Sequence, residues 1–339
     1  MNIGIVGATG QVGGVMLDIL AKRMPDIDEL RLFASPRSAG KEITWNGRSI
    51  IVEDASAASY EGLDIVLFSA GGSTSKELAP KVVLDGAVVV DNSSAWRQDD
   101  GVPLVVVGAN DEDVANCPKG IIANPNCTTM VAMPVMKTLH EAAGLKAMIV
   151  SSYQAVSGSG LAGVDELTNQ IDSASSPASL VTDGQSVSFS EPATYAEPIA
   201  YNALPWAGDL VDDGLYETSE EQKLRYESRK ILGIEDLTVA PTCVRVPVYT
   251  GHSLAITASF ESPITPAEAT NLLSQRSDVI VDNIPTPLKS AGIDESLVGR
   301  IRPSEVFENG LSLFVVGDNL RKGAALNAVQ IAELLAKES

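Results

Sequence analysis

The first thirteen residues, MNIGIVGATGQVG, restrict the fold more than any other part of the chain. A short apolar run at residues 2–7 leads into three glycines spaced three positions apart, and residues 12–23 then carry apolar side chains at helical spacing. A strand, a tight glycine-rich turn and a helix in this order are typical of the first unit of a parallel α/β sheet. We therefore expect an N-terminal Rossmann-like α/β domain.

The alternation of strand and helix signals continues to about residue 125. Four more short, apolar runs rich in β-branched residues occur at 29–34, 64–69, 87–91 and 104–107. Strands that alternate with helical segments predict a parallel sheet with right-handed crossovers. After residue 128 the strand-like runs become longer, at 146–153, 254–260 and 311–317. These runs predict a second, α/β (α+β) domain with a mixed sheet.

The length of 339 residues suits two domains. We expect residues 1–126 to form the first domain together with a returning C-terminal helix at 322–339, and residues 127–321 to form the second. The C-terminal segment is strongly amphipathic, which predicts a helix that packs back on the first domain. Residues 173–198 are rich in Ser, Ala and Pro and have little periodicity, so we expect a long surface excursion there, a subunit contact or a lid.

The glycine-rich turn predicts a bound dinucleotide. Gly7 permits a tight turn, Gly10 lets the backbone approach a pyrophosphate, and Gly13 lets the helix lie close to the sheet. The second strand ends in the string FASPRS, with no carboxylate to bind a ribose 2′-hydroxyl. Arg37, with Ser35 and Ser38 beside it, can instead hold a 2′-phosphate, which indicates NADP; the alternative for Arg37 is a solvated loop cation.

The bulk composition excludes several classes of function. The formal net charge of −20 disfavours nucleic-acid and membrane partners. No apolar stretch approaches the roughly 20 residues needed to span a bilayer, and the N-terminus does not resemble a signal peptide. Three cysteines without a Cys-x-x-Cys pair and only two histidines argue against a disulfide framework and a zinc site. We expect a cytoplasmic protein without a metal.

Cys127 is the candidate nucleophile. It lies in the string NPNCTT, directly before an apolar run that predicts a helix. Unpaired backbone N–H groups and the helix dipole at a helix N-terminus both favour thiolate over thiol. A free cysteine is more often a small buried hydrophobe, but Asn126 and Thr128 make a poor apolar wall for one. We therefore predict a reactive thiolate.

Only His140 and His252 are available as a base. His140 lies thirteen positions along the helix expected after Cys127, about 20 Å away at about 1.5 Å per residue. His252, in the string TGHS, is the remaining candidate, and its alternative is a histidine in a turn. Arg245 lies seven residues before it in an apolar strand. A bend at Pro247 or Gly251 is needed to bring these two residues to one site.

Each of the other charged candidate residues allows two interpretations. Arg245 needs an anionic partner, which is an internal carboxylate or the carboxylate of a substrate. Glu220 and Lys223 share one face of a helix expected between residues 218 and 233, where a solvated ion pair is the default. Arg97 follows a strand end near the expected cofactor crevice. Its position is equally consistent with a phosphate-binding residue and with a solvated cation in a loop.

In combination, these motifs resemble those of the aspartate-β-semialdehyde dehydrogenase family of phosphorylating aldehyde dehydrogenases. The similarity extends over nearly the whole chain, in the strings GATGQVG, SAGGSTS, VDNSSAWR, NPNCTT, SSYQAVSGSG, EEQKLRYESRKIL, RVPVYTGHS and VGDNLRKGAALNAVQ. The resemblance implies NADP as cofactor, small-molecule substrates, and a homodimer or homotetramer. It also implies an N-terminal Rossmann-like domain followed by an α/β catalytic domain.

The resemblance implies a role for each candidate residue. Cys127 would be the acyl-thioester nucleophile, His252 the acid/base and Gln154 the residue that orients the substrate. Five further side chains would bind or support the substrate: Asn126 beside the thiol, Arg97 and Lys223 on the phosphate, Arg245 on the α-carboxylate and Glu220 on the amino group. The residues implied in NADP binding are Gly7, Thr9, Gly10, Gln11, Val12, Ser35, Arg37, Ser38, Ser157, Gly158 and Asn319.

The implied reaction is the NADPH-dependent reductive dephosphorylation of L-4-aspartyl phosphate to L-aspartate 4-semialdehyde, in the biosynthesis of lysine, threonine, methionine and diaminopimelate. Four alternatives remain. A glyceraldehyde-phosphate dehydrogenase would carry Ser in place of Asn126 and a different cofactor loop. A catalytically silent NADP-binding regulator would not need Cys127, Gln154, Arg245 and His252 together. An N-acetyl-γ-glutamyl-phosphate reductase is expected to carry its thiol in a Gly-Cys-Tyr setting, unlike NPNCTT. A Cys/His acyl hydrolase would need neither the glycine-rich turn nor Arg37.

Overall fold

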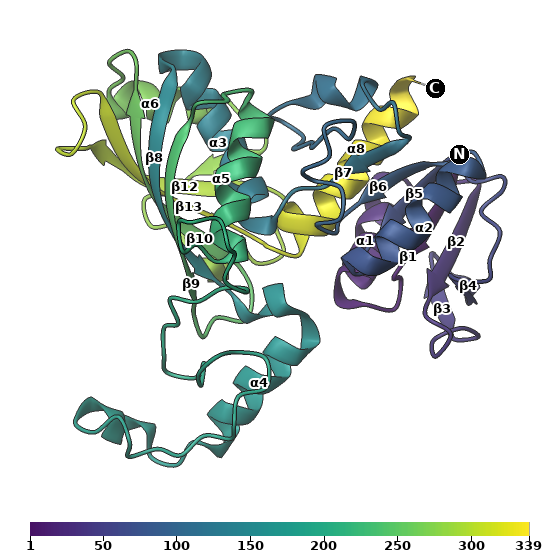
Figure 1. The fold of residues 1–339 in the computed structure, drawn as a ribbon, viewed down its shortest axis with the longest axis horizontal. Coiled ribbons are helices and arrows are strands. Elements are labelled where there is room, and N and C mark those ends of the chain that lie inside the picture. The colour runs from purple at the N-terminus through teal and green to yellow at the C-terminus, as the bar shows by residue number, and fades with distance from the viewer. Residues whose placement is uncertain (339) are drawn as a thin grey trace.

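Two β-sheets and the helices around them make up the computed structural model, which describes residues 1–338 (Figure 1). The first sheet has the strand order β3-β4-β2-β1-β5-β6-β7, and all neighbouring pairs are parallel except β3 and β4. Its strands are β1 (Asn2–Val6), β2 (Glu29–Ala34), β3 (Glu42–Trp45), β4 (Arg48–Asp54), β5 (Ile65–Phe68), β6 (Val88–Asp91) and β7 (Ile121–Ala123). The chain begins in the middle of this sheet and extends to both sides, which creates a crevice at the carboxyl end of β1.

The second sheet is mixed and has the strand order β11-β12-β13-β10-β8-β9. Its strands are β8 (Leu145–Gln154), β9 (Thr238–Arg245), β10 (His252–Phe260), β11 (Val279–Val281), β12 (Ser296–Pro303) and β13 (Gly310–Gly317). Strand β10 is antiparallel to β8 and β13, whereas β8 and β9 are parallel. The two sheets confirm the expected fold class, a parallel N-terminal sheet followed by a mixed sheet.

All the helices except α4 (Gly160–Ser173) pack against the sheets or against one another. The other helices are α1 (Gln11–Arg23), α2 (Gly72–Leu84), α3 (Cys127–Ala143), α5 (Ser219–Leu232), α6 (Pro266–Ser274), α7 (Pro287–Ser290) and α8 (Leu326–Glu338), with 3-10 turns at Asp111–Ala115, Val156–Ser159 and Pro177–Val181. Helix α3 contacts both α5 and α6, and these three helices cover one face of the second sheet. The buried α3 connects the two sheets in sequence.

The C-terminal helix returns to the first sheet, as expected. Leu326, Val329 and Ile331 of α8 share a buried apolar cluster with Ile3 and Ile5 of β1. The regular helix begins later than the expected residue 322, because Arg321–Ala325 form a π-helical turn. In Figure 1, α8 (yellow) lies against the N-terminal elements (purple and blue).

One expected strand is not formed. Residues 104–107 are largely buried, but Leu104 makes only an isolated bridge to Ala123. The proline at position 103 has no N–H to donate, and β7 takes the position beside β6. Burial of a short apolar run therefore did not mean strand pairing. Conversely, no expectation covered the hairpin β3–β4, although its turn residues Asn46 and Gly47 are the strongest local signal for one and both have positive φ.

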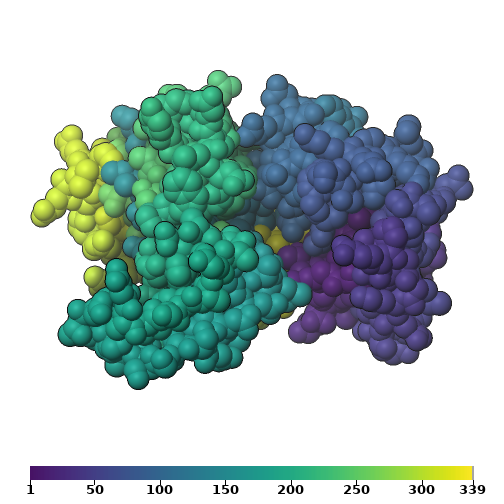
Figure 2. Space-filling model, turned by 60° about the horizontal axis from the view of Figure 1, so that its bottom comes forward, coloured from purple at the N-terminus to yellow at the C-terminus, as the bar shows by residue number. Residues whose placement is uncertain are grey.

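Residues 174–198 form the expected surface excursion. The segment follows α4 and contains only a short 3-10 turn, and most of its side chains are exposed. Figure 1 shows it extending from α4 at the bottom of the view, and Figure 2 shows it in teal on the outer surface. Among residues 1–338, no helix combines the length and the apolar composition that a bilayer crossing requires.

Candidate active site

The start of α3 carries the thiol. Asn126 is the N-cap residue, and its Oδ1 accepts hydrogen bonds from the backbone N–H and the hydroxyl of Thr128 at 3.0 and 2.5 Å. Cys127 is therefore the first residue of the helix, as the sequence predicts. Gly323 of the π-helical turn packs against it, and a Cβ at Gly323 would lie 2.8 Å from the Cβ of Cys127. The C-terminal segment thus forms one wall of the thiol site.

Three strand ends meet at one edge of the second sheet. Gln154 ends β8 and Arg245 ends β9, and the two residues are paired in register. His252 begins β10, which runs antiparallel to β8, so its first residue lies beside the last residues of β8. The bend expected between Arg245 and His252 is present, because the chain leaves the sheet after β9 and Gly251 adopts a φ of +93°. His252 is therefore a strand residue and not part of the turn.

His252 lies directly beside the thiol. Its Nε2 is 3.1 Å from the Sγ of Cys127, and its side chain is fully buried. Its Nδ1 accepts a hydrogen bond from the backbone N–H of Ala155 at 3.0 Å. Burial, and then the charge of Arg245, lower the pKa of His252 to about 3, against the opposite effect of Glu220. The imidazole is accordingly neutral in the resting enzyme.

The surroundings of the sulfur oppose the expected resting thiolate. Burial, and then the charge of Glu220, raise the pKa of Cys127 to about 12. Arg245, Arg97 and Lys223 lower this pKa but do not compensate for the loss of solvent. A helix N-terminus stabilises an anion only modestly, whereas the partial burial of Cys127 costs the sulfur anion more solvation. The resting residue is a thiol.

Glu220 links three of the predicted site residues into a hydrogen-bond network. Its carboxylate accepts hydrogen bonds from Lys223 Nζ at 2.8 Å, from Gln154 Nε2 at 3.1 Å and from Asn126 Nδ2 at 3.1 and 3.2 Å. Burial opposes ionisation, but Lys223, Arg245 and Gln154 together hold the pKa of Glu220 at about 2. The pair of Glu220 and Lys223 is therefore part of the site, and the default reading as a solvated ion pair is wrong.

Arg245 is buried, and no carboxylate of the described residues forms an ion pair with it. Its Nη1 donates to the carbonyl of Ala155 at 3.0 Å, and its Nε has no hydrogen-bond partner among the described residues. No ion pair involving Arg245 occurs within residues 1–338. Arg245, Glu220 and Lys223 line a pocket of about 450 Å³. The buried guanidinium in this pocket favours the reading of Arg245 as a clamp for an anionic ligand over an internal ion pair.

The sequence argument missed two aromatic walls of this pocket. Tyr195 and Trp206 both line it, and the guanidinium of Arg245 lies 5.9 Å from the ring centroid of Tyr195. Tyr195 belongs to the surface excursion, and the end of this segment returns to the pocket. There the Tyr195 hydroxyl donates to the carbonyl of Val156 at 3.3 Å. No local pattern marks these residues, because their position depends on the path of a long irregular segment.

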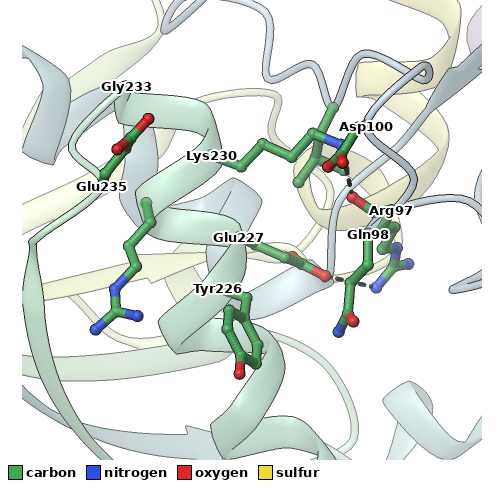
Figure 3. Close-up of a pocket in the computed structure, with 10 residues that line it drawn as sticks. Arg97, Gln98, Asp100, Tyr226, Glu227, Lys230, Gly233 and Glu235 are labelled. Atoms are coloured by element: carbon green, nitrogen blue, oxygen red, sulfur yellow. Dashed lines mark hydrogen bonds and ion pairs between the residues drawn. The ribbon is translucent and has the colours of Figure 1, made fainter.

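The structure does not place Arg97 in the same pocket. Its Nη1 donates to Glu227 at 3.1 Å and its Nη2 to the carbonyl of Asn92 at 3.0 Å, while Nε has no described partner. Arg97 is buried, so it is not a loop cation in solvent. It lines a separate groove of about 710 Å³ beside α5, which Figure 3 shows with Glu227 reaching towards Arg97. Arg97 nevertheless lowers the pKa of Cys127, which places its charge near the thiol.

Glu227 is a further site residue that the sequence argument missed. Its second carboxylate oxygen accepts the backbone N–H of Asn126 at 2.7 Å. The available signal was its spacing on α5, since Glu220, Lys223, Glu227 and Lys230 recur at intervals that place them on one helical face. Lys230 donates to the carbonyls of Arg97, Asp99 and Val102. This face of α5 thus contacts both the N-cap of α3 and the segment that follows β6.

The glycine-rich turn borders a second pocket, of about 400 Å³. It lies at the carboxyl ends of β1, β2 and β5 and is lined by Gly7, Thr9, Gly10 and Ser35 of the predicted cofactor residues. Gly7 has a φ of +88°, and a Cβ there would lie 2.3 Å from the carbonyl oxygen of Ser69. Only glycine can occupy this position in the turn. The resulting open backbone at the N-terminus of α1 is suited to bind the phosphates of a dinucleotide.

The remaining predicted cofactor residues lie in two places. Gln11 and Val12 begin α1, and the Oε1 of Gln11 is buried without a described partner. Ser38 accepts a hydrogen bond from Thr9 at 3.5 Å, and Arg37 is exposed with no ion pair among the described residues. An unpaired cation at the end of β2, without a carboxylate in the same string, fits a 2′-phosphate.

Ser157, Gly158 and Asn319 lie near Arg245 and His252 instead of the glycine-rich turn. Asn319 donates to Ser157 Oγ at 2.9 Å and accepts from the backbone N–H of Gly251 at 2.8 Å. A Cβ at Gly158 would lie 3.0 Å from Arg245 Nη1 and 3.1 Å from the His252 ring. Figure 2 shows a hollow between the N-terminal and the teal parts of the molecule, with C-terminal residues (yellow) at its floor.

Comparison with known proteins gives consistent matches. The family models "Semialdehyde dehydrogenase, NAD binding domain" and "Semialdehyde dehydrogenase, dimerisation domain" match residues 2–117 and 136–322. The chain is 61% identical to an aspartate-semialdehyde dehydrogenase of Streptomyces akiyoshiensis, over 100% of this chain and 99% of that protein. It is 58% identical to one of Corynebacterium glutamicum, over 99% of each. The crystal structure of aspartate semialdehyde dehydrogenase II from Vibrio cholerae, complexed with ASA, is similar with a TM-score of 0.92 and 39% identity, over 99% of this chain and 98% of that chain.

Proposed function

Because the chain belongs to the aspartate-semialdehyde dehydrogenase family, we propose that it reduces L-4-aspartyl phosphate to L-aspartate 4-semialdehyde with release of phosphate. The observation that carries this proposal is the 3.1 Å contact between Cys127 Sγ and His252 Nε2, in a buried site that also holds a guanidinium without a carboxylate. Acyl transfer from an anionic substrate to sulfur requires a nucleophile, a neighbouring imidazole and an anion clamp.

The pocket charges match an α-amino acid. Arg245 offers a guanidinium to the α-carboxylate, and a bidentate pair of this kind fixes the orientation of the substrate. Glu220 is ionised and offers a carboxylate to the α-ammonium group. An N-acetylated substrate has no ammonium group for Glu220 to bind, which disfavours an N-acetyl-γ-glutamyl-phosphate reductase. A Cys/His acyl hydrolase has no use for the pocket at the glycine-rich turn.

In the reaction, the Cys127 sulfur attacks the acyl carbon, and the bond from that carbon to the phosphate oxygen breaks. Gln154 and Asn126 each donate a hydrogen bond to Glu220, which holds their side chains in place. We assign both residues to orienting the acyl group. The leaving phosphate is held by Lys223 and by Arg97, whose Nε is its one nitrogen without a described partner. NADPH, when bound, supplies the hydride that reduces the resulting thioester. The reduced carbon then expels the Cys127 sulfur and becomes the aldehyde.

The residues that would hold NADP are those of the glycine-rich turn and of the FASPRS string. Gly7, Thr9 and Gly10 line the pocket where a pyrophosphate would reach the helix N-terminus. Arg37 and Ser38 would bind the 2′-phosphate. Ser157 and Asn319, near His252, would bind the nicotinamide end. We divide the chain accordingly into a cofactor domain of residues 1–126 with 322–339 and a catalytic domain of residues 127–321.

The proposal includes a homodimer formed through the second sheet. Ile149 and Tyr153 of β8 are 44% and 39% exposed on the face of that sheet opposite α3, and the Tyr153 ring lies 6.0 Å from that of Phe314. The family model over this region is described as a dimerisation domain, which supports a second copy as the occupant of this face. Three free cysteines and a mechanism that needs a reduced thiol fit the cytoplasm.

The experiment that tests the function is a spectrophotometric assay with NADP, phosphate and aspartate semialdehyde, compared with N-acetylglutamate semialdehyde. NADPH formation with the first aldehyde only is the expected result. Cys127→Ala should abolish turnover and keep cofactor binding, whereas Cys117→Ala is the matched control that should keep both. Turnover of only the acetylated substrate, or activity in Cys127→Ala, would contradict the proposal.

A further inference from the structure

One edge of the Arg245 guanidinium is free of hydrogen bonds. Its Nη1 donates to the carbonyl of Ala155 at 3.0 Å, which is the only hydrogen bond of this side chain within residues 1–338. The two other nitrogens, Nε and Nη2, lie side by side along one edge of the planar group. A carboxylate can accept from both of them at once, so the Ala155 carbonyl leaves a bidentate edge open.

The ring of Tyr195 lies against the same guanidinium. The Cζ of Arg245 is over this ring, 5.9 Å from its centroid. The ring hydroxyl donates to the carbonyl of Val156 at 3.3 Å. Gly163 of α4 leaves space for that hydroxyl, because a Cβ there would lie 2.4 Å from it. One end of the ring is therefore held in place while its face packs against the cation.

Two side chains of α4, one helical turn apart, hold the irregular backbone on both sides of Tyr195. Glu166 Oε2 accepts two consecutive backbone N–H groups just before Tyr195, at 3.1 and 2.6 Å. Gln170 is fully buried, and its Oε1 accepts the backbone N–H groups of Ile199 and Ala200 at 2.9 and 3.0 Å. These four bonds satisfy backbone groups that have no strand partner, so they fix the path of the segment.

The same segment continues to the main chain of the clamp. Leu204 belongs to a small buried apolar cluster with Val156 and Leu167, apart from the two larger clusters of the molecule. Leu204 also pairs with Arg245, and the backbone N–H of each donates to the carbonyl of the other at 2.9 and 2.8 Å. We call residues 193–204 the strap, since they contact both the main chain and the side chain of Arg245.

We propose that Tyr195 is a positioning residue that acts through Arg245 and holds its Nε–Nη2 edge ready for the α-carboxylate of the substrate. The strap, fastened to α4 by Glu166 and Gln170, keeps the ring in place. The proposal rests on the proposed function, because it takes the ligand of Arg245 to be the carboxylate of an amino acid. No contact between Tyr195 and the reacting atoms is part of it.

An aromatic ring is chemically suited to this position. The face of a tyrosine attracts a desolvated guanidinium through the ring quadrupole, and it accepts none of the N–H groups along the edge of that guanidinium. A carboxylate in the same place would form an ion pair with Arg245 and would compete with the substrate. An aliphatic side chain would fill the space without attracting the cation. The ring therefore orients Arg245 and leaves its donors for the ligand.

Substitution of Tyr195 separates the ring from its hydroxyl. We expect Tyr195→Leu to raise the KM for aspartate semialdehyde about five- to thirty-fold, while kcat and the KM for NADP change less than about two-fold. Tyr195→Phe keeps the ring and should raise this KM at most about three-fold. Tyr201→Leu is the matched control, since Tyr201 is an exposed residue of the strap that does not line the pocket. Equal KM values for the leucine and phenylalanine variants of Tyr195 would overturn the proposal.

A pair of thiol reagents tests the clamp without turnover. In 2-sulfonatoethyl methanethiosulfonate, the anion is as many bonds from the reactive sulfur as the α-carboxylate is from the aldehyde carbon of aspartate semialdehyde. The 2-hydroxyethyl reagent is its neutral counterpart. The background is Cys117→Ala, since Cys243 is buried and Cys127 is then the reactive thiol.

The measured quantity is the ratio of the rates at which the anionic and the neutral reagent label Cys127. We expect Tyr195→Leu to lower this ratio at least about five-fold and Tyr195→Phe to retain it. An unchanged ratio in Tyr195→Leu would overturn the proposal. Absence of turnover with aspartate semialdehyde would count against the proposed function alone, because this assay needs no substrate.

The same assay shows whether the ring acts through Arg245. Arg245→Gln removes the cation, so the addition of Tyr195→Leu should have no further effect on the ratio in that background. A further loss of similar size in the double variant would mean that the ring acts on the anion independently of Arg245. That result would overturn the proposal.

Glu166→Ala tests the fastening of the strap. The substitution removes the acceptor of two backbone N–H groups, so we expect deuterium exchange in residues 187–200 to accelerate at least about ten-fold. The KM and the reagent ratio should change in the same direction as in Tyr195→Leu. Asp165→Ala removes the same charge from an exposed neighbouring position of α4 and should leave all three quantities unchanged. Faster exchange without a change in KM or in the reagent ratio would overturn the role of the strap.

Discussion

Glu227 joins Arg97 to the helix that carries the thiol. One carboxylate oxygen accepts Arg97 Nη1 at 3.1 Å, and the other accepts the backbone N–H of Asn126 at 2.7 Å, directly before Cys127. Both side chains are buried, so the pair lies in a low-dielectric setting where the loss of one partner is costly. A cation that follows β6 and the N-cap of α3 thus share one carboxylate.

Substitution Glu227→Gln should affect both stability and phosphate use. We expect about 3 kcal/mol of lost stability, because Arg97 keeps a buried charge without its partner. We also expect the KM for phosphate to rise about ten-fold, because the guanidinium is no longer held in place. The matched control is Glu217→Gln, which breaks the buried pair at 2.7 Å between Glu217, just before α5, and Arg225 of that helix. Urea unfolding and phosphate-dependent kinetics would show whether only Glu227→Gln changes the KM.

Substitution Arg245→Lys should separate charge from geometry in the carboxylate clamp. A lysine keeps the charge but not the planar fork, so we expect the KM for aspartate semialdehyde to rise about ten- to one-hundred-fold. The control is Arg48→Lys at an exposed position, which should leave this KM unchanged. Steady-state kinetics measure the change, and an unchanged KM would return Arg245 to a purely structural role.

Substitution Arg37→Ala should weaken NADP binding and leave NAD binding unchanged. The side chain is exposed and has no ion-pair partner within residues 1–338, so its removal should cost little stability. Loss of one charge-assisted phosphate contact should weaken binding about ten-fold or more. Lys41→Ala, at an exposed cation of the same region, is the control. Calorimetric titration with both cofactors decides, since equal losses for NADP and NAD would remove the 2′-phosphate role.

The buried histidine should make the protein sensitive to acid. The pKa of His252 is about 3 in the folded state against 6.5 in the unfolded chain, so the unfolded state binds the proton first. The stabilising contribution is complete above pH 6.5 and is lost as the pH falls, by about 2 kcal/mol at pH 5. Urea unfolding at pH 7 and pH 5 measures this loss. His252→Gln should remove it and His140→Gln should not; a loss of equal size in both variants would assign it to other groups.

Local patterns determined the parts of the molecule that depend on neighbouring residues. The glycine spacing after β1 predicted the cradle at Gly7, because only a residue without a Cβ fits there. The string NPNCTT placed Cys127 at the start of α3, because an asparagine N-cap and a following apolar run define a helix start. The boundaries of α5 followed in the same way from Thr218 and Gly233. The NG turn of β3–β4 was equally local and readable, although no expectation used it.

Tertiary structure decided where the distant residues of the site meet and which protonation states they have. Arg245 and His252 meet because β8 separates their strands and sets the register on both sides, which no spacing along the chain encodes. The sequence placed Cys127 at a helix N-terminus and suggested a thiolate, but burial by residues far along the chain makes it a thiol. Local sequence fixes backbone geometry because the relevant forces act between neighbours. Desolvation depends on all the atoms that surround a group, and only the folded chain brings these together.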